Sequence, residues 1–525
     1  MKQFSNSQSL RQGLEEGIRI VAENVASTLG PKGRTVILHQ KGQNPITTKD
    51  GVTVARFIDL EDPFQNAGAQ IVKQAAEKTN QEAGDGTTTT TVLTYAMYRE
   101  AQKYLAAGAP PIELKKGMEL AVAHLVSEIE AAATPIKSVE DMQNIATIAA
   151  NGDETIGKLV AKAVDLAGKD GSVTIEEARS LETSLDLVEG FRFDSGYLAT
   201  AFINDEQRGL VQYDNPLIMV TDEKIETVED MLPALELAAR ETRPFVIVAE
   251  DIEGQALASL IMNAMRGTMR ICGIKAPRYG EERRNILKDL ATSVGATMIS
   301  REMGVKLKEA KLTHFGEVKK IEVTKNFTTM VGGAGDLNEI ERQIEKLKAI
   351  MQDTESLDEC EKIQERITRL VSGVSVIRVG AATEIEMIEK RHRIEDALES
   401  VRAAQMEGIL PGGGSFLVQH SVNLMDKVKE RINNEWQELG VKIVQQAIKE
   451  PLRQMCKNAG ESPDLILDQV QIEEVNYGYD FKHEAIVDVL CSGIIDPARV
   501  TRCALQNAVS VASTLITSNY AIIET

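Results

Sequence analysis

Apolar residues recur at spacings of three and four over the first part of the chain, a pattern that predicts an amphipathic helix. The stripe is formed by Leu10, Leu14, Ile18, Val21, Val25 and Leu29. It ends at Gly30 and Pro31, because both residue types disfavour continuation of a helix. Two short segments rich in β-branched residues, at 35–38 and 53–58, predict strands on either side of a turn at Asp50.

The helical pattern returns between residues 64 and 165, with breaks at 84–86 and at 109–111. The middle of the chain differs, since it contains short apolar runs that are typical of buried strands. These runs lie at 216–220, 245–249, 271–274 and 296–299. Helical patterns such as those at 228–240 and 254–266 separate them. This alternation predicts an α/β domain whose strands are covered on both faces.

Two heptad-spaced segments follow the predicted α/β region. Apolar residues step by three and four at 337, 340, 344, 347 and 351, and again at 360, 363, 367 and 370. We expect an antiparallel helical hairpin packed on its own domain, with a partner-binding coiled coil as the alternative. After Gly380 the pattern is helical to the end of the sequence. Helical flanks around an α/β middle predict a multidomain, mainly helical chain with an α/β insertion.

Composition sets broad limits on function. A chain of 525 residues exceeds one ordinary core and predicts two to four domains. Its apolar fraction of 43% excludes a disordered chain, and its aromatic content of 4% predicts aliphatic cores. The net charge of -20 argues against a nucleic-acid partner, because such binding depends on cationic side chains.

Targeting and metal signals are weak. The N-terminus lacks the apolar run of a secretory signal, and polar residues interrupt the apolar stretch at 504–523. We expect a buried helix there, with a membrane span as the remote alternative. Five scattered cysteines without a Cys-x-x-Cys pair predict free thiols in a reducing compartment, and the six histidines show no zinc-binding spacing. The expectation is a cytoplasmic protein with no membrane partner.

The strongest candidate for chemistry is the sequence GDGTTTTT at 84–91, directly before a helical pattern. A helix N-terminus offers unpaired backbone N–H groups that suit phosphate, and threonine hydroxyls add donors. Asp85 is suited to the Mg²⁺ that accompanies nucleotide phosphates. The alternative is an ordinary cap with a threonine-rich first turn. Successive threonines are poor helix formers, which favours a functional role.

Taken singly, the other glycine-rich turns and acids do not distinguish a nucleotide site from ordinary helix ends and caps. The turns at 28–34 (TLGPKGR) and 411–415 (PGGGS) resemble many helix ends. Asp50, Asp396 and Asp496 lie near turns, and each alone is equally consistent with a cap or a solvated charge. A P-loop-like spacing at 152–159 (GDETIGKL) has leucine where Mg²⁺ needs a hydroxyl, and no strand precedes it. We interpret that segment as an ordinary helix.

Taken in order, the motifs of the chain resemble those of the group I chaperonins, the GroEL family, essentially from end to end. They are TLGPKGR at 28–34, TKDGV at 48–52, AGDGTTT at 83–89, VGAATE at 379–384, EDA at 395–397, GGG at 412–414 and NYGY at 476–479. The resemblance implies the chaperonin fold in three domains. These are a helical equatorial ATPase domain (1–131 and 407–525), a small hinge-like intermediate domain (132–188 and 375–406) and an α/β apical domain (189–374).

The resemblance also implies a function. Family members fold non-native client proteins in an ATP-driven cycle, inside homo-oligomeric rings that are heptameric and usually take a co-chaperonin lid. The implied cofactors are ATP, Mg²⁺ and K⁺. The apical domain would bind clients and the lid.

The implied nucleotide site draws on both ends of the chain. Asp85 matches the Mg²⁺ ligand, and the phosphate cradle matches Gly86, Thr87, Thr88 and Thr89. The loop against the nucleotide matches Thr28, Leu29, Gly30 and Pro31, and backbone oxygens of Thr28 and Lys49 would hold K⁺. Asp396 would orient the attacking water, with Asp50 near the γ-phosphate. The positions implied at the ribose and base are Gly413, Asp480 and Asp496.

The implied client-binding groove is apolar. It matches Tyr197, Phe202, Leu232, Leu235, Leu257, Ile261 and Met262. Leu257 and Ile261 are four residues apart, so one helix face could present an adaptable apolar ridge. The alternative is that such a stripe is part of the core.

The chain departs from the family pattern at several positions. Asp480 stands where the family has an asparagine against adenine, which predicts looser base selectivity. Ala201 replaces a groove tyrosine, and Ser195 replaces an arginine that pairs between subunits with the acid matching Glu384. The sequence also ends at Thr525 without the Gly-Met-rich tail. These departures keep a second hypothesis open, a chaperonin-like ring or holdase with weak or uncoupled hydrolysis. A small-molecule kinase is a remote third.

Overall fold

The structure, a computed structural model, describes residues 2–39, 45–168, 172–178, 180–205, 208–302, 304–354, 357–371, 373–474 and 476–524. The chain forms two compact units. Unit 1 consists of Met1–Lys162, Glu177–Glu182 and Val379–Thr525, and unit 2 of Ala163–Glu176 and Thr183–Arg378. Unit 2 therefore interrupts unit 1 in the sequence, as the predicted insertion requires. The finer division into three domains stays a prediction.

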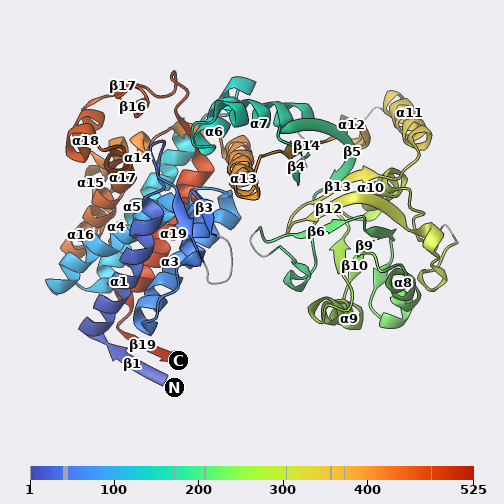
Figure 1. Cartoon of the computed structure of the whole chain (residues 1–525), viewed down its shortest axis with the longest axis horizontal. Helices are drawn as coiled ribbons and strands as arrows, with labels where there is room; N and C mark the ends of the chain where they lie inside the picture. Colours follow the sequence, from blue (N-terminus) through green and yellow to red (C-terminus); the bar gives the residue numbers. More distant parts are fainter. Residues whose placement is uncertain are drawn as a thin grey trace. The chain divides into compact units, whose positions relative to one another are not determined.

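Long helices form the core of unit 1 (Figure 1). The packed helices are α1 (Ser7–Ala26), α3 (Pro63–Ala83), α4 (Thr87–Ala106), α5 (Pro111–Ala132), α16 (Glu435–Ala447) and α19 (Ala498–Thr517). Their buried faces are almost entirely aliphatic, as the composition predicts. The strands β1 (Lys2–Asn6) and β19 (Tyr520–Glu524) pair in antiparallel fashion, so the two ends of the chain lie side by side.

Further helices and short strand pairs complete unit 1. The helices are α2 (Gly51–Phe57), α6 (Val139–Ala149), α7 (Glu154–Ala167), which runs on into unit 2, α13 (Glu384–Glu407), α14 (Ser415–Ser421), α15 (Leu424–Val428), α17 (Glu450–Ala459) and α18 (Pro463–Ile472). The strand pairs are β2 (Val36–Leu38) with β3 (Ile46–Thr48), β15 (Ile409–Pro411) with β18 (Ile495–Pro497), and β16 (Tyr477–Asp480) with β17 (Ala485–Asp488).

A large sheet organises unit 2. Within the described residues it has nine strands in the order β11-β9-β7-β12-β13-β5-β14-β4, with β6 also paired to β12. The strands are β4 (Ser172–Glu177), β5 (Ser184–Phe193), β6 (Val211–Asp214), β7 (Leu217–Val220), β9 (Phe245–Ala249), β11 (Ile271–Lys275), β12 (Gly316–Val323), β13 (Thr328–Gly333) and β14 (Gly373–Val379). β7, β9 and β11 run parallel and are buried nearly throughout, which confirms coverage on both faces.

Helices surround this sheet. They are α8 (Val228–Glu241), α9 (Gly254–Met265), α10 (Gly280–Val294), α11 (Leu337–Asp353) and α12 (Leu357–Val371). The last two pack together as the predicted hairpin. Buried Asp289 of α10 accepts two hydrogen bonds from Arg366 of α12, at 2.7 and 2.9 Å, and one from Gln343 of α11, at 3.1 Å. The hairpin therefore packs on its own unit, as expected.

Three local predictions need correction. Residues 53–58 belong to α2 rather than to a strand, because Asp50 caps a helix there with its carboxylate. The apolar run at 296–299 forms only a parallel bridge between Ile299 and Thr221. α1 ends at Ala26, before the predicted Gly30, since the last apolar residue of the stripe, Leu29, packs into a neighbouring cluster.

Two other interpretations hold. The P-loop-like segment at 152–159 runs into α7 and follows α6 rather than a strand. The apolar stretch near the C-terminus is the buried helix α19. In the described part of the chain, every helix is too short or too polar to span a membrane.

Candidate nucleotide site

The threonine-rich turn leads directly into α4. Gly84 ends α3 and Gly86 begins α4, both with left-handed backbone conformation. Among the described residues no side chain caps the helix at Gly86, so these residues leave the N–H groups of its first turn open to a ligand. The alternative of an ordinary cap by Asp85 is therefore wrong.

The threonine hydroxyls of α4 fall into two groups. Those of Thr90 and Thr91 donate to the carbonyls of Gly86 and Thr87, both at 2.9 Å, so they satisfy the helix itself. Within the described residues, those of Thr87, Thr88 and Thr89 have no hydrogen-bond partner. The first turn thus offers both backbone and side-chain donors, the arrangement that a phosphate needs.

Asp50 lies beside this turn. Its carboxylate accepts hydrogen bonds from Val52 N (3.0 Å), Thr53 N (2.9 Å) and Thr53 Oγ1 (2.5 Å), so it is a helix cap, as the simpler interpretation expected. A Cβ atom on Gly51 would lie 2.3 Å from Thr88 Oγ1. Only glycine allows the Asp50 turn to approach the start of α4 this closely.

Helix α13 closes the site from the other side. Asp396 and Ser400 are four residues apart, so they occupy the same face of the helix. Ser400 Oγ donates to Asp85 Oδ2 at 2.5 Å, and Gly86 N donates to Asp85 Oδ1 at 2.5 Å. A Cβ atom on Gly84 would lie 2.3 Å from Glu399 Cβ, which again requires glycine. Sequence reasoning missed Ser400, because a serine inside a helix belongs to no motif.

Two acids of the site, Asp85 and Asp396, have raised pKa values. Burial raises the pKa of Asp396 well above its usual range, and the charges of Asp50 and Asp85 add to this shift. Burial also raises the pKa of Asp85, and the charge of Asp50 adds to it, while donation from Ser400 and Gly86 partly offsets the shift. These carboxylates lie close enough to repel one another, so the site favours a cation.

This donor set fits a nucleotide with Mg²⁺. Among the described side chains, no group of three or more acids, histidines or cysteines forms a complete metal cage. Mg²⁺ at nucleotide sites is typically held by one or two carboxylates, with phosphate and water oxygens completing its shell. Asp85 can supply such a carboxylate beside the phosphate donors of α4.

A second glycine-rich turn faces β18. Burial raises the pKa of Asp496 to about 6, although its carboxylate accepts hydrogen bonds from the backbone N–H groups of Gly414 and Gly413. The negative charge of Asp85 also raises this pKa slightly, so the two carboxylates are close enough to interact electrostatically. The structure therefore brings Asp496 of β18 against the turn that carries Gly413.

The turn after α1, which carries Thr28, Leu29, Gly30 and Pro31, is held from α17. Asn458 Nδ2 donates to the carbonyl oxygens of Ala26 and Leu29, both at 2.9 Å. Lys49 follows β3 on a separate segment, and its expected role in K⁺ binding stays a prediction.

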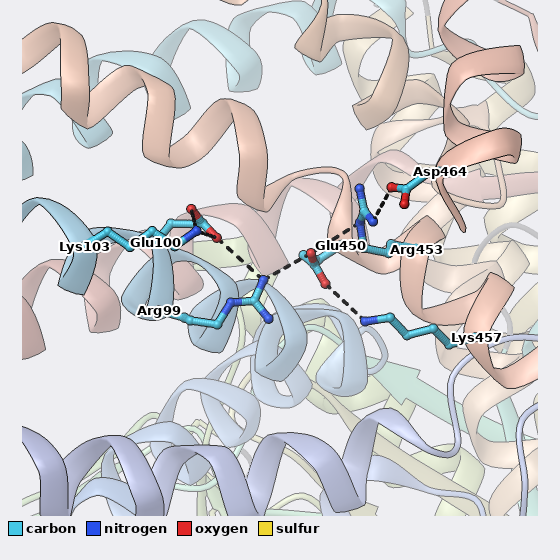
Figure 2. A network of polar contacts seen from close by, with 7 residues as sticks. All are labelled: Arg99, Glu100, Lys103, Glu450, Arg453, Lys457 and Asp464. Carbon is cyan, nitrogen blue, oxygen red and sulfur yellow. Dashed lines mark hydrogen bonds and ion pairs between the residues drawn. The ribbon is translucent and has the colours of Figure 1, made fainter. Parts of the chain in front are cut away.

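α17 is itself tied to α4 by ion pairs (Figure 2). Glu450 lies 3.2 Å from Arg99 of α4 and 3.5 Å from Arg453, which also contacts Asp464 of α18 at 2.6 Å. Lys457 approaches the same Glu450 at 3.9 Å. α17 therefore contacts both the turn after α1 and helix α4, which begins with the threonine-rich turn.

Asp480 is already engaged within its own turn. Its carboxylate accepts hydrogen bonds from Lys482 N at 2.7 Å and His483 N at 3.4 Å, and pairs with His483 Nδ1 at 2.5 Å. The histidine and the backbone donors lower the pKa of Asp480 despite the opposing effect of burial. These three contacts use most of the acceptor directions of the carboxylate, and the expected role of Asp480 at the adenine stays a prediction.

The expected client-binding residues of unit 2 differ in how exposed their side chains are. Phe202 and Leu235 are 2% and 7% exposed and belong to the core, so their expected contact with clients is wrong in this structure. Tyr197, Leu257 and Ile261 are partly buried against that core.

The exposed members are Leu232 of α8 and Met262 of α9, at 47% and 46%. Met265, which is 72% exposed, extends the ridge of Ile261 and Met262 by one helical turn. The sequence prediction missed Met265, although its i,i+4 spacing from Ile261 could have revealed it.

Comparisons with known proteins agree with this architecture. The model of the TCP-1/cpn60 chaperonin family matches residues 21–525. A similar solved structure is the crystal structure of the chaperonin gp146 from the bacteriophage EL 2 (Pseudomonas aeruginosa) in the presence of ATP-BeFx. The two chains are 22% identical over 99% of each, with a TM-score of 0.66, which shows a shared fold. The chain belongs to the TCP-1/cpn60 chaperonin family and is an ATP-dependent protein-folding chaperonin.

Proposed function

We propose that the site at the start of α4 binds ATP with Mg²⁺ and hydrolyses it, and that hydrolysis drives the folding of bound clients. The observation that carries the proposal is the convergence of Asp50, Asp85 and Asp396 on an uncapped helix N-terminus. Phosphoryl transfer requires mainly positioning and charge neutralisation, which these groups can supply.

Each group has a distinct role in this proposal. The N–H and hydroxyl groups of Thr87, Thr88 and Thr89 would bind phosphate oxygens. Asp85 would hold Mg²⁺, which neutralises charge on the phosphates. Asp396 would orient the attacking water and accept its proton. Because Asp50 and Asp85 contribute to the raised pKa of Asp396, neutralising their charge in the loaded site favours the ionised form that the reaction needs.

The remaining nucleotide contacts are finer proposals. Asp496 would accept hydrogen bonds from ribose hydroxyls, with Gly413 beside them. Backbone oxygens of Thr28 and Lys49 would hold K⁺. The double hydrogen bond from Asn458 supports a fixed position for the Thr28 loop.

Clients and partners form the other half of the function. Chaperonins bind unfolded proteins and assemble into oligomeric rings. We expect Leu232, Met262 and Met265 to contact clients, because exposed methionine adapts to varied apolar partners. A heptameric ring, a co-chaperonin lid and a cytoplasmic location are further parts of the proposal. All five cysteines are free thiols, as a reducing compartment would keep them.

The decisive test is Asp396→Ala in the full chain. We expect kcat for ATP hydrolysis to fall at least about 100-fold, because a positioned general base is lost, while ATP still binds. Steady-state hydrolysis and equilibrium nucleotide binding measure the two effects. Asp468→Ala, an exposed acid of α18, is the matched control and should retain activity. Unchanged hydrolysis in Asp396→Ala would contradict the assignment.

The alternative is a ring or holdase with weak or uncoupled hydrolysis. The engaged carboxylate of Asp480 favours it, since base recognition would then be weakened. Client refolding, measured with and without ATP and a lid protein, separates the two functions. A wild-type protein that prevents aggregation without ATP and never releases folded client would favour the alternative.

A further inference from the structure

The hydroxyl of Ser400 has an unusual hydrogen-bond partner for a serine inside a helix. Such hydroxyls commonly donate to the carbonyl four residues earlier, as those of Thr147, Thr292 and Thr368 do in this chain. Ser400 instead donates to Asp85 Oδ2 at 2.5 Å, although the two residues lie 315 positions apart. Its side chain is almost fully buried. The contact is therefore built into the packing of α13 against the Asp85 turn.

Two hydrogen bonds orient the carboxylate of Asp85 and still leave it able to bind a metal ion. One of its oxygens accepts from Ser400 Oγ and the other from Gly86 N, so the plane of the carboxylate is held at both ends. A carboxylate offers about four lone-pair directions, so acceptor capacity remains on both oxygens. Glu399, adjacent to Ser400, packs directly against Gly84 and keeps α13 at this position.

We propose that Ser400 is a positioning residue for the Mg²⁺ site, and this rests on the proposed function. It fixes the Asp85 carboxylate in the orientation in which it receives the metal. Because Asp396 lies on the same face of α13 one turn earlier, the same contact sets the distance between the metal ligand and the acid that orients water. Ser400 touches neither metal nor substrate.

The consequence concerns metal binding more than nucleotide binding. Without the hydroxyl, Asp85 keeps one donor and gains rotational freedom, which it must lose again when the metal binds. The Mg²⁺ concentration that half-saturates ADP binding should rise about three- to tenfold, as expected for loss of one orienting hydrogen bond. Binding of ADP without Mg²⁺ should stay unchanged.

The test uses three full-length variants and a fluorescent ADP analogue titrated with Mg²⁺. Ser400→Ala removes the donor, and Ser400→Cys keeps similar volume with only a weak S–H donor, so both should show the shift. Ser513→Ala is the matched control, since Ser513 is also a buried serine inside a helix, in α19, and its hydroxyl has no partner among the described residues. It should behave as wild type. Thermal unfolding of each variant checks that the fold is intact.

Several results would overturn the inference. An unchanged or lowered Mg²⁺ requirement in both Ser400 variants would show that the hydrogen bond does not position the metal ligand. An equal loss of ADP binding with and without Mg²⁺ would indicate a purely structural role and would also refute it. If the wild type binds ADP with no dependence on Mg²⁺, the proposed function fails together with the inference. The Asp396→Ala measurement tests that function independently.

Discussion

Burial raises the pKa of Asp496, whereas its local hydrogen bonds lower it. Two backbone N–H groups donate to its carboxylate, yet burial raises its pKa to about 6. An unfolded aspartate titrates near pH 3.9. The folded protein therefore binds this proton more tightly than the unfolded chain does. The contribution of Asp496 to stability is greatest below about pH 4 and is lost as the pH rises through about 6.

Asp496→Asn removes this titration while keeping an acceptor. At pH 7 we expect the variant to be more stable than wild type by about 1–3 kcal/mol, a range that allows for partial solvent screening. The difference should vanish near pH 4. Trp436, the only tryptophan, lies in α16 of unit 1, so its fluorescence during urea unfolding reports on this unit. A stability difference that does not change with pH would contradict the prediction.

The sequence indicated a functional role for some residues of the site and not for others. Asp85 was identified from its place before a threonine-rich helix, and Asp50 from its place in a turn. The importance of Asp396 came only from the family resemblance, since nothing local distinguishes an acid inside a charged helix. Ser400 had no signal at all, because its role depends on a partner from a distant part of the chain.

At the scale of elements, α17 links two parts of the site. It holds the loop after α1 through Asn458, and it pairs with α4 through Glu450 and Arg99. Neither contact is visible in the helical pattern of α17, because the pattern shows which face is apolar and leaves the partner of each polar residue open. The strand wrongly predicted at 53–58 has a related cause, since the cap formed by Asp50 outweighed β-branched propensity.

Asn458→Ala should loosen the loop after α1. It leaves two partly buried carbonyls without their donor, so we expect a loss of about 1–3 kcal/mol in the stability of that segment. Amide hydrogen exchange of residues 27–33 should accelerate accordingly. Asn24→Ala is the control, because Asn24 is exposed and donates to a single carbonyl of its own helix. Equal exchange in wild type and Asn458→Ala would refute the role of this amide.

At the scale of the molecule, the chain divides into units with separate cores. The main core of unit 2 consists entirely of residues between Phe191 and Met330, with Leu370 packed against it. Its central strands are parallel neighbours covered on both faces, so we expect them to fold without the helices of unit 1.

A fragment covering Thr183–Arg378 should therefore fold alone. We expect cooperative thermal unfolding and a near-ultraviolet circular dichroism spectrum typical of fixed packing. A fragment of similar length that joins parts of both units, residues 100–295, serves as the control and should not fold cooperatively. Loss of near-ultraviolet signal in the 183–378 fragment, with helical content retained, would indicate a molten state and contradict the prediction.

The sequence by itself determined the long helices, the buried strands, the inserted α/β region and the threonine-rich turn before a helix. These features depend on spacing and caps within short segments, and local chemistry is sufficient to specify them. Only the tertiary structure decided which groups meet. Asp50, Asp85 and Asp396 converge because α13 packs across α3 and α19, elements that lie far from it in the sequence. Burial and the neighbouring negative charges then raise the pKa values of Asp85 and Asp396, and no local pattern contains that information.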